Sequence, residues 1–280
     1  MDILIYNPLS RNGNDPKFID KIEKKIKKKT KSVKRVNVLD IKNVKDFIAQ
    51  LNDNDRIIIV GGDGTLNRIV NEIYDIDYQQ KIYMYQAGTG NDFIRSLKNK
   101  HKLVHITPYL KKLPTITYEN KTKYFLNGAG LGLDGYVIRL VDQSKHKKNK
   151  LNYFRCAIEG FKKFKPVSAT FTIDGKTYHE NKLWFISALN AAYQGGGMKM
   201  APHAKRDEDM LDLLVIKNLS KFLLFVIFPT IYIGLHIKFK KYVKVYKGKD
   251  IEVSINQDTY MQVDGESKYP IRNIKIKAAK

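Results

Sequence analysis

Cysteine is nearly absent from this chain of 280 residues, which contains only Cys156. A single cysteine excludes an internal disulfide framework, and nothing around Cys156 suggests a nucleophile, so we expect a buried, inert thiol. We also expect no signal peptide, because residues 3–6 (Ile-Leu-Ile-Tyr) are typical of a first strand. These absences favour a cytoplasmic protein.

Long apolar runs are missing as well. The most hydrophobic stretch, residues 222–235, is too short for a membrane span and is interrupted by Pro229 and Gly234. We expect a buried or cleft-lining helix there. Contact with a lipid substrate or with the bilayer surface is the alternative, because several lysines follow directly.

Acidic residues are few relative to basic ones, with 28 Asp+Glu against 51 Lys+Arg and a formal net charge of +23. Such a balance favours an anionic partner: nucleic acid, an acidic membrane or a phosphorylated substrate. Apolar spacing predicts a helix over residues 18–31, and lysines fill the rest of it. No aromatic side chain is interleaved there for base stacking, so we expect a solvated face or contact with anionic lipid, and no nucleic acid.

The chain is organised around residues 57–71. The first four form a continuous apolar run, the pattern of a strand buried on both faces. Gly61, Gly62 and Gly64 follow, and they allow positive φ or the close approach of another group. Thr65 is placed to cap a helix with an apolar stripe. A strand, a glycine turn and a helix in this order aim backbone N–H groups at a phosphate.

Two familiar phosphate-binding patterns are missing from this turn, because neither Gly-Lys-Ser/Thr nor Gly-x-Gly-x-x-Gly occurs in it. The alternative interpretation is an ordinary strand-to-helix turn in which the glycines serve only the backbone. Asp63 lies inside the turn, where a carboxylate repels phosphate unless a cation or a hydrogen-bond network mediates. Asp63 therefore indicates either a nearby Mg²⁺ or a residue that braces the loop.

Three segments together resemble the diacylglycerol kinase catalytic-domain family, which includes sphingosine kinases and bacterial lipid kinases. They are Gly-Gly-Asp-Gly-Thr-Leu-Asn at 61–67, Asn-Pro-Leu-Ser at 7–10 and Gly-Thr-Gly-Asn-Asp-Phe at 88–93, in the family's order and spacing. In the loop at 7–10, Arg11 stands where the family usually has glycine. The resemblance implies an ATP site formed by Asn7, Pro8, Ser10, Gly61, Gly62, Asp63, Gly64, Thr65, Asn67, Gly88, Thr89, Asn91 and Asp92.

Strands and helices alternate through the first hundred or so residues, which predicts a largely parallel sheet with covering helices. Strand-like segments then follow one another, with an Asp-Gly hairpin turn at 174–175 and helices expected at 152–163 and 219–239. This pattern predicts a second, mainly antiparallel domain.

The resemblance implies the same organisation. It implies an α/β nucleotide-binding domain of the NAD kinase and phosphofructokinase type, followed by a β-sandwich-like domain, with the active site between them. We assign residues 1–117 to the nucleotide-binding domain and residues 118–269 to the β-rich substrate domain. The family's C-terminal segment returns to the first domain, so residues 270–280 are expected to be candidates for that return.

Residues 262–266 place two carboxylates, Asp264 and Glu266, around Gly265. By its residues alone this segment is a good hairpin turn. It also resembles the family's Asp-Gly-Glu loop, which implies that it carries the catalytic base. Phosphoryl transfer to an alcohol needs a group that accepts the hydroxyl proton. We assign the base to Glu266 and an orienting or Mg²⁺-holding role to Asp264, with the reverse assignment left open.

Residues 202–212 resemble a further family segment, which holds a Mg²⁺ in some bacterial members. The resemblance implies that Glu208 stands in place of the ligand aspartate and that Lys205 and Met210 supply backbone carbonyls. Oxygen-only ligation suits Mg²⁺. The alternative is a charged surface turn. The six histidines show no metal-ligand spacing.

The leading hypothesis is a Mg²⁺- and ATP-dependent lipid kinase that phosphorylates a hydroxyl of a membrane lipid, foremost diacylglycerol. The expected partners are that lipid, the anionic inner face of the membrane and a second copy in a homodimer. A kinase of a soluble substrate, like the NAD kinases, is one alternative. A non-catalytic lipid- or nucleotide-binding member of the family is another. Asn67 and the separate Asp-Gly-Glu loop favour the lipid branch.

Overall fold

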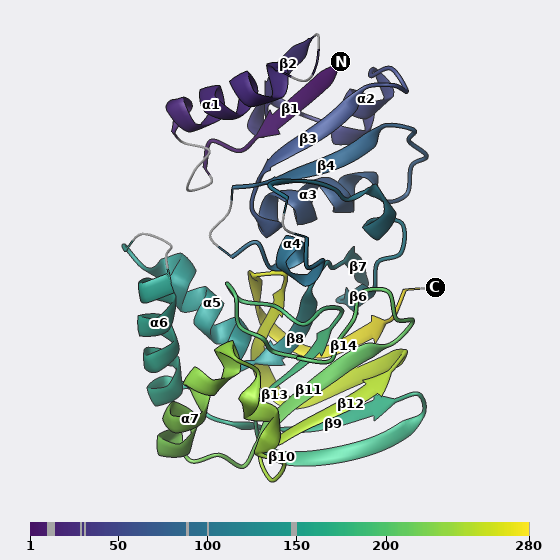
Figure 1. The fold of residues 1–280 in the computed structure, drawn as a ribbon. Helices are drawn as coiled ribbons and strands as arrows, with labels where there is room; N and C mark the ends of the chain where they lie inside the picture. The colour runs from purple at the N-terminus through teal and green to yellow at the C-terminus, as the bar shows by residue number, and fades with distance from the viewer. Residues whose placement is uncertain are drawn as a thin grey trace. The chain divides into compact units, whose positions relative to one another are not determined.

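The chain divides into two compact units, Met1–Lys112 and Leu113–Lys280, each with its own sheet (Figure 1). The computed structural model describes residues 1–9, 15–28, 30, 32–87, 90–99, 101–146 and 150–279. Among these residues there is no helix with both the length and the apolar character needed to cross a membrane.

The first unit is built on a five-stranded sheet in the order β2-β1-β3-β4-β5. Its strands are β1 (Asp2–Tyr6), β2 (Val33–Asn37), β3 (Arg56–Gly61), β4 (Lys81–Gln86) and β5 (Leu103–His105). The first four pair in parallel, as predicted, whereas β5 pairs antiparallel with β4. The central strands β1 and β3 are buried along most of their length, which explains why both are continuous apolar runs in the sequence.

The helices of the first unit lie between these strands in the chain. They are α1 (Pro16–Lys27), α2 (Val44–Ala49), α3 (Asp63–Ile73) and α4 (Asp92–Ser96), with single turns η1 (Val38–Asp40) and η2 (Thr107–Tyr109). Helix α1 buries an isoleucine stripe as predicted, but it begins earlier than residue 18. The Asp15 carboxylate accepts the Lys17 N–H, and Pro16 suits the first helical turn, so together they fix the start.

The second unit is built on nine strands that all pair antiparallel, as predicted. They are β6 (Thr115–Tyr118), β7 (Lys121–Tyr124), β8 (Gly128–Gly132), β9 (Val167–Ile173), β10 (Lys176–Leu189), β11 (Leu211–Lys217), β12 (Val243–Gly248), β13 (Asp250–Val263) and β14 (Glu266–Lys277). The two Asp-Gly turns join β9 to β10 and β13 to β14, where the sequence places hairpins.

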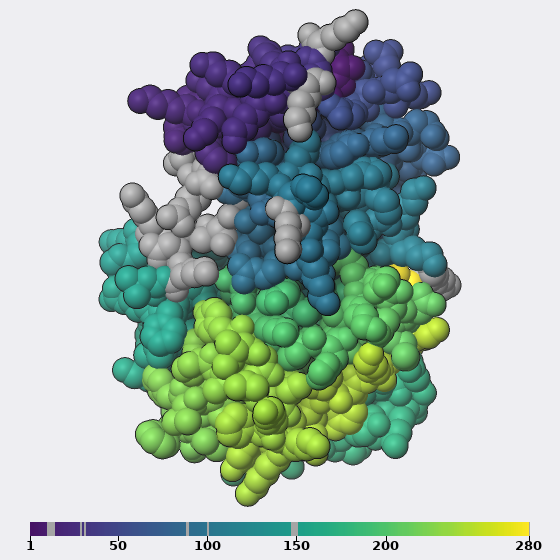
Figure 2. Space-filling model, in the orientation of Figure 1, coloured from purple at the N-terminus to yellow at the C-terminus, as the bar shows by residue number. Residues whose placement is uncertain are grey.

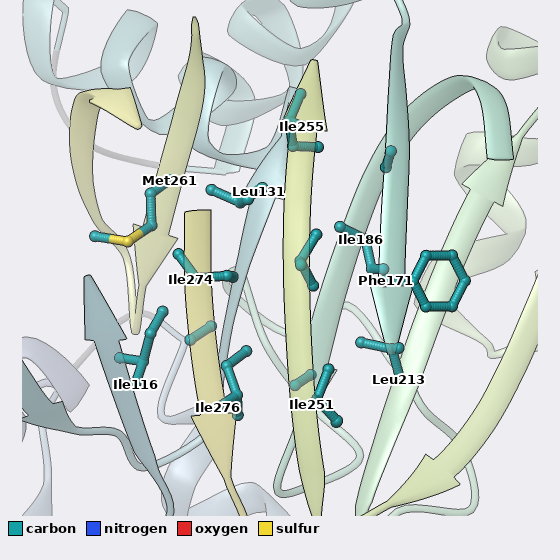
Figure 3. Close-up of a cluster of buried hydrophobic side chains, with 14 of the residues drawn as sticks. Ile116, Leu131, Phe171, Ile186, Leu213, Ile251, Ile255, Met261, Ile274 and Ile276 are labelled. Carbon is teal, nitrogen blue, oxygen red and sulfur yellow. The ribbon is translucent and has the colours of Figure 1, made fainter. Parts of the chain in front are cut away.

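Two long strands fold this sheet over on itself. The first part of β10 pairs with β9 and its last part pairs with β8, and β13 changes partner between the same two strands. The sheet therefore forms a sandwich whose interior is filled by apolar side chains. Figure 3 shows Leu131, Ile186 and Ile274, from β8, β10 and β14, pointing into that interior.

Helices cover one side of the second unit. They are α5 (Leu133–Gln143), α6 (Lys150–Lys163) and α7 (Lys221–Ile227), followed by single turns η3 (Phe228–Tyr232) and η4 (Leu235–Lys238). The prediction of one helix over residues 219–239 is wrong. Pro229 lies in the first turn of η3, and Gly234 takes a left-handed conformation with φ 78°, so the helix breaks at both residues.

The ends of the second unit differ from the assigned domain limits. Strand β6 begins at Thr115 and pairs with β7 and β14, so the residues just before 118 contribute to the second sheet. Strand β14 continues to Lys277 in the same sheet, paired with β13 and β6. Residues 270–277 therefore complete the second unit, where the sequence left a return to the first open.

Candidate active site

In the first unit, three loops at the carboxyl ends of β1, β3 and β4 are tied together by two side chains. The Asn7 side-chain amide donates to the Thr65 hydroxyl at 3.0 Å. The Asp63 carboxylate accepts the backbone N–H groups of Asp92 at 2.9 Å and Phe93 at 3.0 Å. Residues from all three predicted loops are thus brought together, and Asp63 fills the bracing role.

The glycine turn differs from the prediction in how it starts its helix. Helix α3 begins at Asp63 with Gly62 as its N-cap, so the assignment of Thr65 as the cap is wrong. The Thr65 hydroxyl is engaged by Asn7 from inside the helix. Gly62 has φ −98° and is extended, so the turn does not depend on positive φ there. Gly61 is required by space, because a Cβ there would lie 2.9 Å from the Thr65 Cβ.

The remaining predicted nucleotide residues are placed less directly. Asn67 is buried on α3 and accepts a hydrogen bond from the Asn71 amide at 3.2 Å. Asn91 has φ 48° and precedes α4. Ser10, Gly88 and Thr89 lie outside the described residues, as does Arg11. What the described part offers is the N-terminus of α3 beside tied loops, an arrangement that attracts an anion such as phosphate.

In the second unit, the turn between β13 and β14 is fixed by Asp264. Asp264 has φ 45° and Gly265 has φ 90°, the two left-handed residues of a tight hairpin turn. The Asp264 carboxylate accepts the backbone N–H groups of Leu126, Asn127 and Gly128. Asp264 therefore joins the hairpin to the segment that leads into β8, as a positioning carboxylate.

A polar network around residues 126–128 was not found by sequence reasoning. The Arg206 guanidinium donates to the Leu126 carbonyl and, at 2.8 Å, to the Asn127 side chain. The Asn190 amide donates to the same Leu126 carbonyl at 3.1 Å. The only sequence signal was weak: an asparagine directly before the glycines of β8. Its partners come from segments far along the chain, so no local pattern reveals them.

Glu266 lies beside the Asp264 turn and is more accessible. Its side chain is 58% exposed, and its Oε2 lies 3.1 Å from the Lys123 Nζ on β7. Burial of Lys123 lowers the pKa of its ammonium, but the Glu266 carboxylate outweighs that effect and the pKa of Lys123 is raised. Of the two predicted catalytic carboxylates, Glu266 is the more exposed.

The predicted Mg²⁺ ligands are engaged by lysines. Glu208 has one carboxylate oxygen 3.2 Å from the Lys205 Nζ and the other 2.6 Å from the Lys247 Nζ. The Lys205 carbonyl accepts the Glu208 N–H in a tight turn, and Met210 follows it. Within the described ranges no cluster of three His, Cys, Asp or Glu side chains gathers around a point. Because both oxygens of the Glu208 carboxylate face lysine ammonium groups, this donor set does not fit a resident Mg²⁺.

An apolar cavity lies in the second unit between the sheet and α5, α6, α7, η3 and η4. Its lining is apolar apart from a few groups, notably Asp134 and His236. Burial raises the pKa of the Asp134 carboxyl to about 6, although Ser187 donates to it at 2.5 Å. Burial likewise lowers the pKa of the His236 imidazole to about 4, so this imidazole is neutral at pH 7, whereas the Asp134 carboxyl, with a pKa of about 6, is mostly ionised there.

Family models match both parts of the chain. Residues 2–117 match the diacylglycerol kinase catalytic domain. Residues 128–274 match the YegS C-terminal NAD kinase beta sandwich-like domain. The fold of each unit thus agrees with the predicted pairing of a nucleotide-binding α/β domain and a β-sandwich-like domain.

Individual relatives agree with these models. The chain is 28% identical over 232 residues to the "Putative lipid kinase YtlR" of Bacillus subtilis, which covers 75% of this chain and 74% of that protein. It is 26% identical over 230 residues to the diacylglycerol kinase of the same organism, covering 78% and 73%. A crystal structure described as a "putative diacylglycerol kinase" from Bacillus anthracis superposes with a TM-score of 0.70 at 21% identity, covering 98% and 91%, a likeness of fold.

Proposed function

This chain belongs to the diacylglycerol kinase catalytic-domain family, and on that premise we propose that it is an ATP-dependent lipid kinase. The proposed acceptor is the hydroxyl of a membrane lipid. Diacylglycerol is the expected substrate, because relatives such as the Bacillus subtilis protein carry that name, and phosphatidic acid is the expected product.

The observation that carries the lipid acceptor is the apolar cavity of the second unit. It is lined by side chains such as Val137, Phe161 and Ile227 and offers few polar groups. Ligand pockets take their selectivity from the chemistry of their lining. A dinucleotide carries charges and many hydrogen-bonding groups that this lining would leave unpartnered, whereas an acyl chain matches it. The cavity therefore supports a lipid over a soluble acceptor.

The first unit supplies the proposed nucleotide site. The N-terminus of α3 and the tied loops are suited to the phosphates of ATP, which enters as its Mg²⁺ complex and is a substrate in this proposal. The Asp63 carboxylate is turned to the backbone N–H groups of Asp92 and Phe93, so its charge is partly satisfied by the protein. It holds the loops in place and does not need to contact phosphate.

The second unit supplies the proposed base. The lipid hydroxyl loses its proton to the Glu266 carboxylate as its oxygen bonds to the γ-phosphorus. The bond from that phosphorus to the bridging oxygen of ATP breaks, and ADP leaves with the electron pair. Asp264 positions this loop through its three backbone hydrogen bonds. Lys123, whose Nζ lies 3.1 Å from Glu266 Oε2, pairs with this carboxylate and orients it.

We further propose that the protein acts at the anionic inner face of the membrane. The net charge of +23 supports this, because basic residues near an anionic surface each add to binding. A homodimer is also proposed; sedimentation of the purified chain would measure it.

The test is transfer of labelled γ-phosphate from ATP to diacylglycerol, to other lipid alcohols and to NAD. Glu266→Ala should reduce the rate on diacylglycerol by about a hundredfold or more, the usual contribution of a general base. Glu252→Ala is the matched control, because Glu252 is 57% exposed and pairs with Lys275, much as Glu266 pairs with Lys123. Transfer to NAD alone would favour the soluble-substrate alternative. ATP binding without transfer to any acceptor would favour a non-catalytic protein.

A further inference from the structure

The segment from α7 to the start of β12 combines apolar surface with charge of one sign. No Asp or Glu occurs between Asp212 and Asp250. The charged residues in that interval are lysines, and Lys221, Lys238, Lys240 and Lys241 are all exposed. The interval is therefore long, largely apolar and free of acidic residues.

Large apolar side chains on this segment face solvent. We define the apolar edge as Phe222 (78% exposed), Val226 (51%), Ile233 (64%), Leu235 (41%) and Phe239 (37%). Phe222 and Val226 are one turn apart on α7 and share a face of the helix. In Figure 2 the light green surface of the second unit belongs to this part of the chain. Apolar exposure at this density marks an interaction surface.

The opposite side of the same segment is buried. Leu224, Ile227 and Ile231 are at most 5% exposed and line the apolar cavity. Helix α7 is therefore apolar on both its inner and its outer faces. A helix of a surface layer ordinarily carries polar residues on its outer face, so the outer face of α7 is suited to an apolar environment other than the protein core.

The lysines beside the apolar edge are available to a partner. No ion pair is recorded for Lys238, Lys240 or Lys241 within the part of the chain that the structure describes. Helix α1 provides the contrast, because it is also rich in lysine but its apolar stripe is buried. Lysine-rich sequence alone does not distinguish the two regions, but the exposed apolar side chains do.

We infer that residues 221–241 are a membrane-docking element, which lays the apolar edge into the headgroup and acyl boundary of an anionic bilayer while its lysines contact lipid phosphates. Lysines flanking exposed aromatic and aliphatic side chains are the pattern of such interfacial segments. A second copy of the chain is disfavoured as the occupant, because a two-fold interface would set the same lysines against each other.

Docking here would also serve the cavity. Helix α7 contributes exposed side chains to the apolar edge and buried side chains to the cavity lining. A lipid can therefore pass between the bilayer and the cavity along the apolar side chains of one segment. This deepens the proposed function and rests on it for the identity of the cavity's ligand. Docking itself is measured without turnover, so the two can fail separately.

The experiment is co-sedimentation of the full chain with vesicles of phosphatidylcholine, with and without phosphatidylglycerol. We expect binding only with phosphatidylglycerol. The double variant Phe222→Asp, Ile233→Asp and the triple variant Lys238→Gln, Lys240→Gln, Lys241→Gln should each bind at least tenfold more weakly, since one interfacial lysine contributes about fivefold. Fluorescence of Trp184, whose indole donates to the Leu219 carbonyl just before α7, reports whether each variant is folded.

Two controls test whether vesicle binding depends on this surface or only on the net charge of the chain. Leu39→Asp adds the same acidic group at a residue 44% exposed in the first unit. Lys21→Gln, Lys24→Gln, Lys28→Gln removes three charges from and beside α1. Both should change binding less than threefold. Equal losses in test and control variants would overturn the inference. The inference would also be overturned if the wild-type chain bound neither kind of vesicle. The same holds if the wild-type chain formed a dimer that the double aspartate variant does not form. Vesicle binding without phosphate transfer would retain docking and reject the kinase.

Discussion

The two units each contain a turn in which an aspartate follows or precedes glycine, and the two aspartates behave alike. Asp63 accepts backbone N–H groups from the start of α4, and Asp264 accepts them from the segment before β8. The glutamate beside the second turn behaves differently, because Glu266 is exposed and pairs with Lys123. A short carboxylate inside a turn braces the backbone, whereas a longer one beside it can reach a substrate.

The difference between the units lies in how far apart the braced segments are. Asp63 and Phe93 are 30 residues apart and belong to successive strand-to-helix turns of a parallel sheet. Asp264 and Leu126 are 138 residues apart and meet only when the antiparallel sheet has formed. The Asp264 carboxylate therefore holds together segments that are much farther apart in the sequence than those that Asp63 joins.

We expect the largest effect on stability from removal of the Asp264 carboxylate. Asp264→Ala leaves three N–H groups without their charged acceptor, and we expect the free energy of unfolding of the second unit to fall by about 4 kcal/mol or more. Urea unfolding followed by Trp184 fluorescence measures it, because Trp184 is the chain's single tryptophan and lies in this unit. Glu266→Ala, in the same hairpin but exposed, should change the same quantity by less than about 1 kcal/mol. Equal unfolding midpoints for the two variants would contradict the bracing role.

A second prediction concerns the pH dependence of stability, which has opposite signs for Asp134 and for Asp55 of the first unit. Burial raises the pKa of Asp134 from 3.8 to about 6. Folding thus favours the protonated form of Asp134. Its contribution to the free energy of unfolding is fully present below about pH 4 and is lost as the pH rises through 6. The loss amounts to about 3 kcal/mol. Asp55 has the opposite sign, because the N-terminal ammonium lowers the pKa of its carboxyl.

Asp134→Asn tests this by comparison with wild type. The difference in unfolding free energy between the two, from urea curves at several pH values, should shift in favour of the variant between pH 4 and 7. Subtracting one curve from the other removes the titration of every other group. A difference that stays constant over this interval would mean that Asp134 is ionised throughout.

The sequence predicts local elements of this protein well. The strand, glycine turn and helix around residues 57–71 are where their apolar pattern places them, because that pattern is set by neighbours in the chain. Thr65 is the exception, since its hydroxyl meets Asn7 from another loop and the helix starts earlier. The single helix expected over 219–239 fails for a local reason that the sequence did contain, Pro229 and Gly234.

The candidate site of the second unit was less accessible to prediction. Glu266 and Asp264 were found through a family motif, but Arg206, Asn127 and Asn190 were not, because their hydrogen bonds join segments from three parts of the chain. The Mg²⁺ ligands were carried over from the family pattern. Lys247, which pairs with Glu208, lies 39 residues further along the chain in β12, so the residues around Glu208 give no sign of it.

A third, smaller effect is expected in the first unit. Asp63→Ala removes the acceptor of two N–H groups, so we expect that unit to lose about 2 kcal/mol, less than Asp264→Ala takes from the second. Hydrogen exchange at the amides of Asp92 and Phe93 should quicken accordingly, while Trp184 fluorescence stays unchanged. Asp77→Ala, an exposed aspartate of the same unit, is the control. Unchanged exchange at both amides would show that α4 is held without Asp63.

The smallest expected effect tests whether Glu208 pairs with lysines or binds a metal ion. Hydrogen bonding to Lys247, and then to Lys205, lowers the pKa of Glu208, so its contribution is present above pH 4.5 and is lost as the pH falls further. Both partners are partly exposed, and Glu208→Gln should therefore cost less than about 1 kcal/mol. Chelation of Mg²⁺ should leave the urea midpoint of the second unit unchanged in wild type and variant alike, although it removes the nucleotide complex and stops turnover. A midpoint that rises with Mg²⁺ in wild type but not in Glu208→Gln would instead place an ion at Glu208, since only binding to the folded state raises stability with concentration.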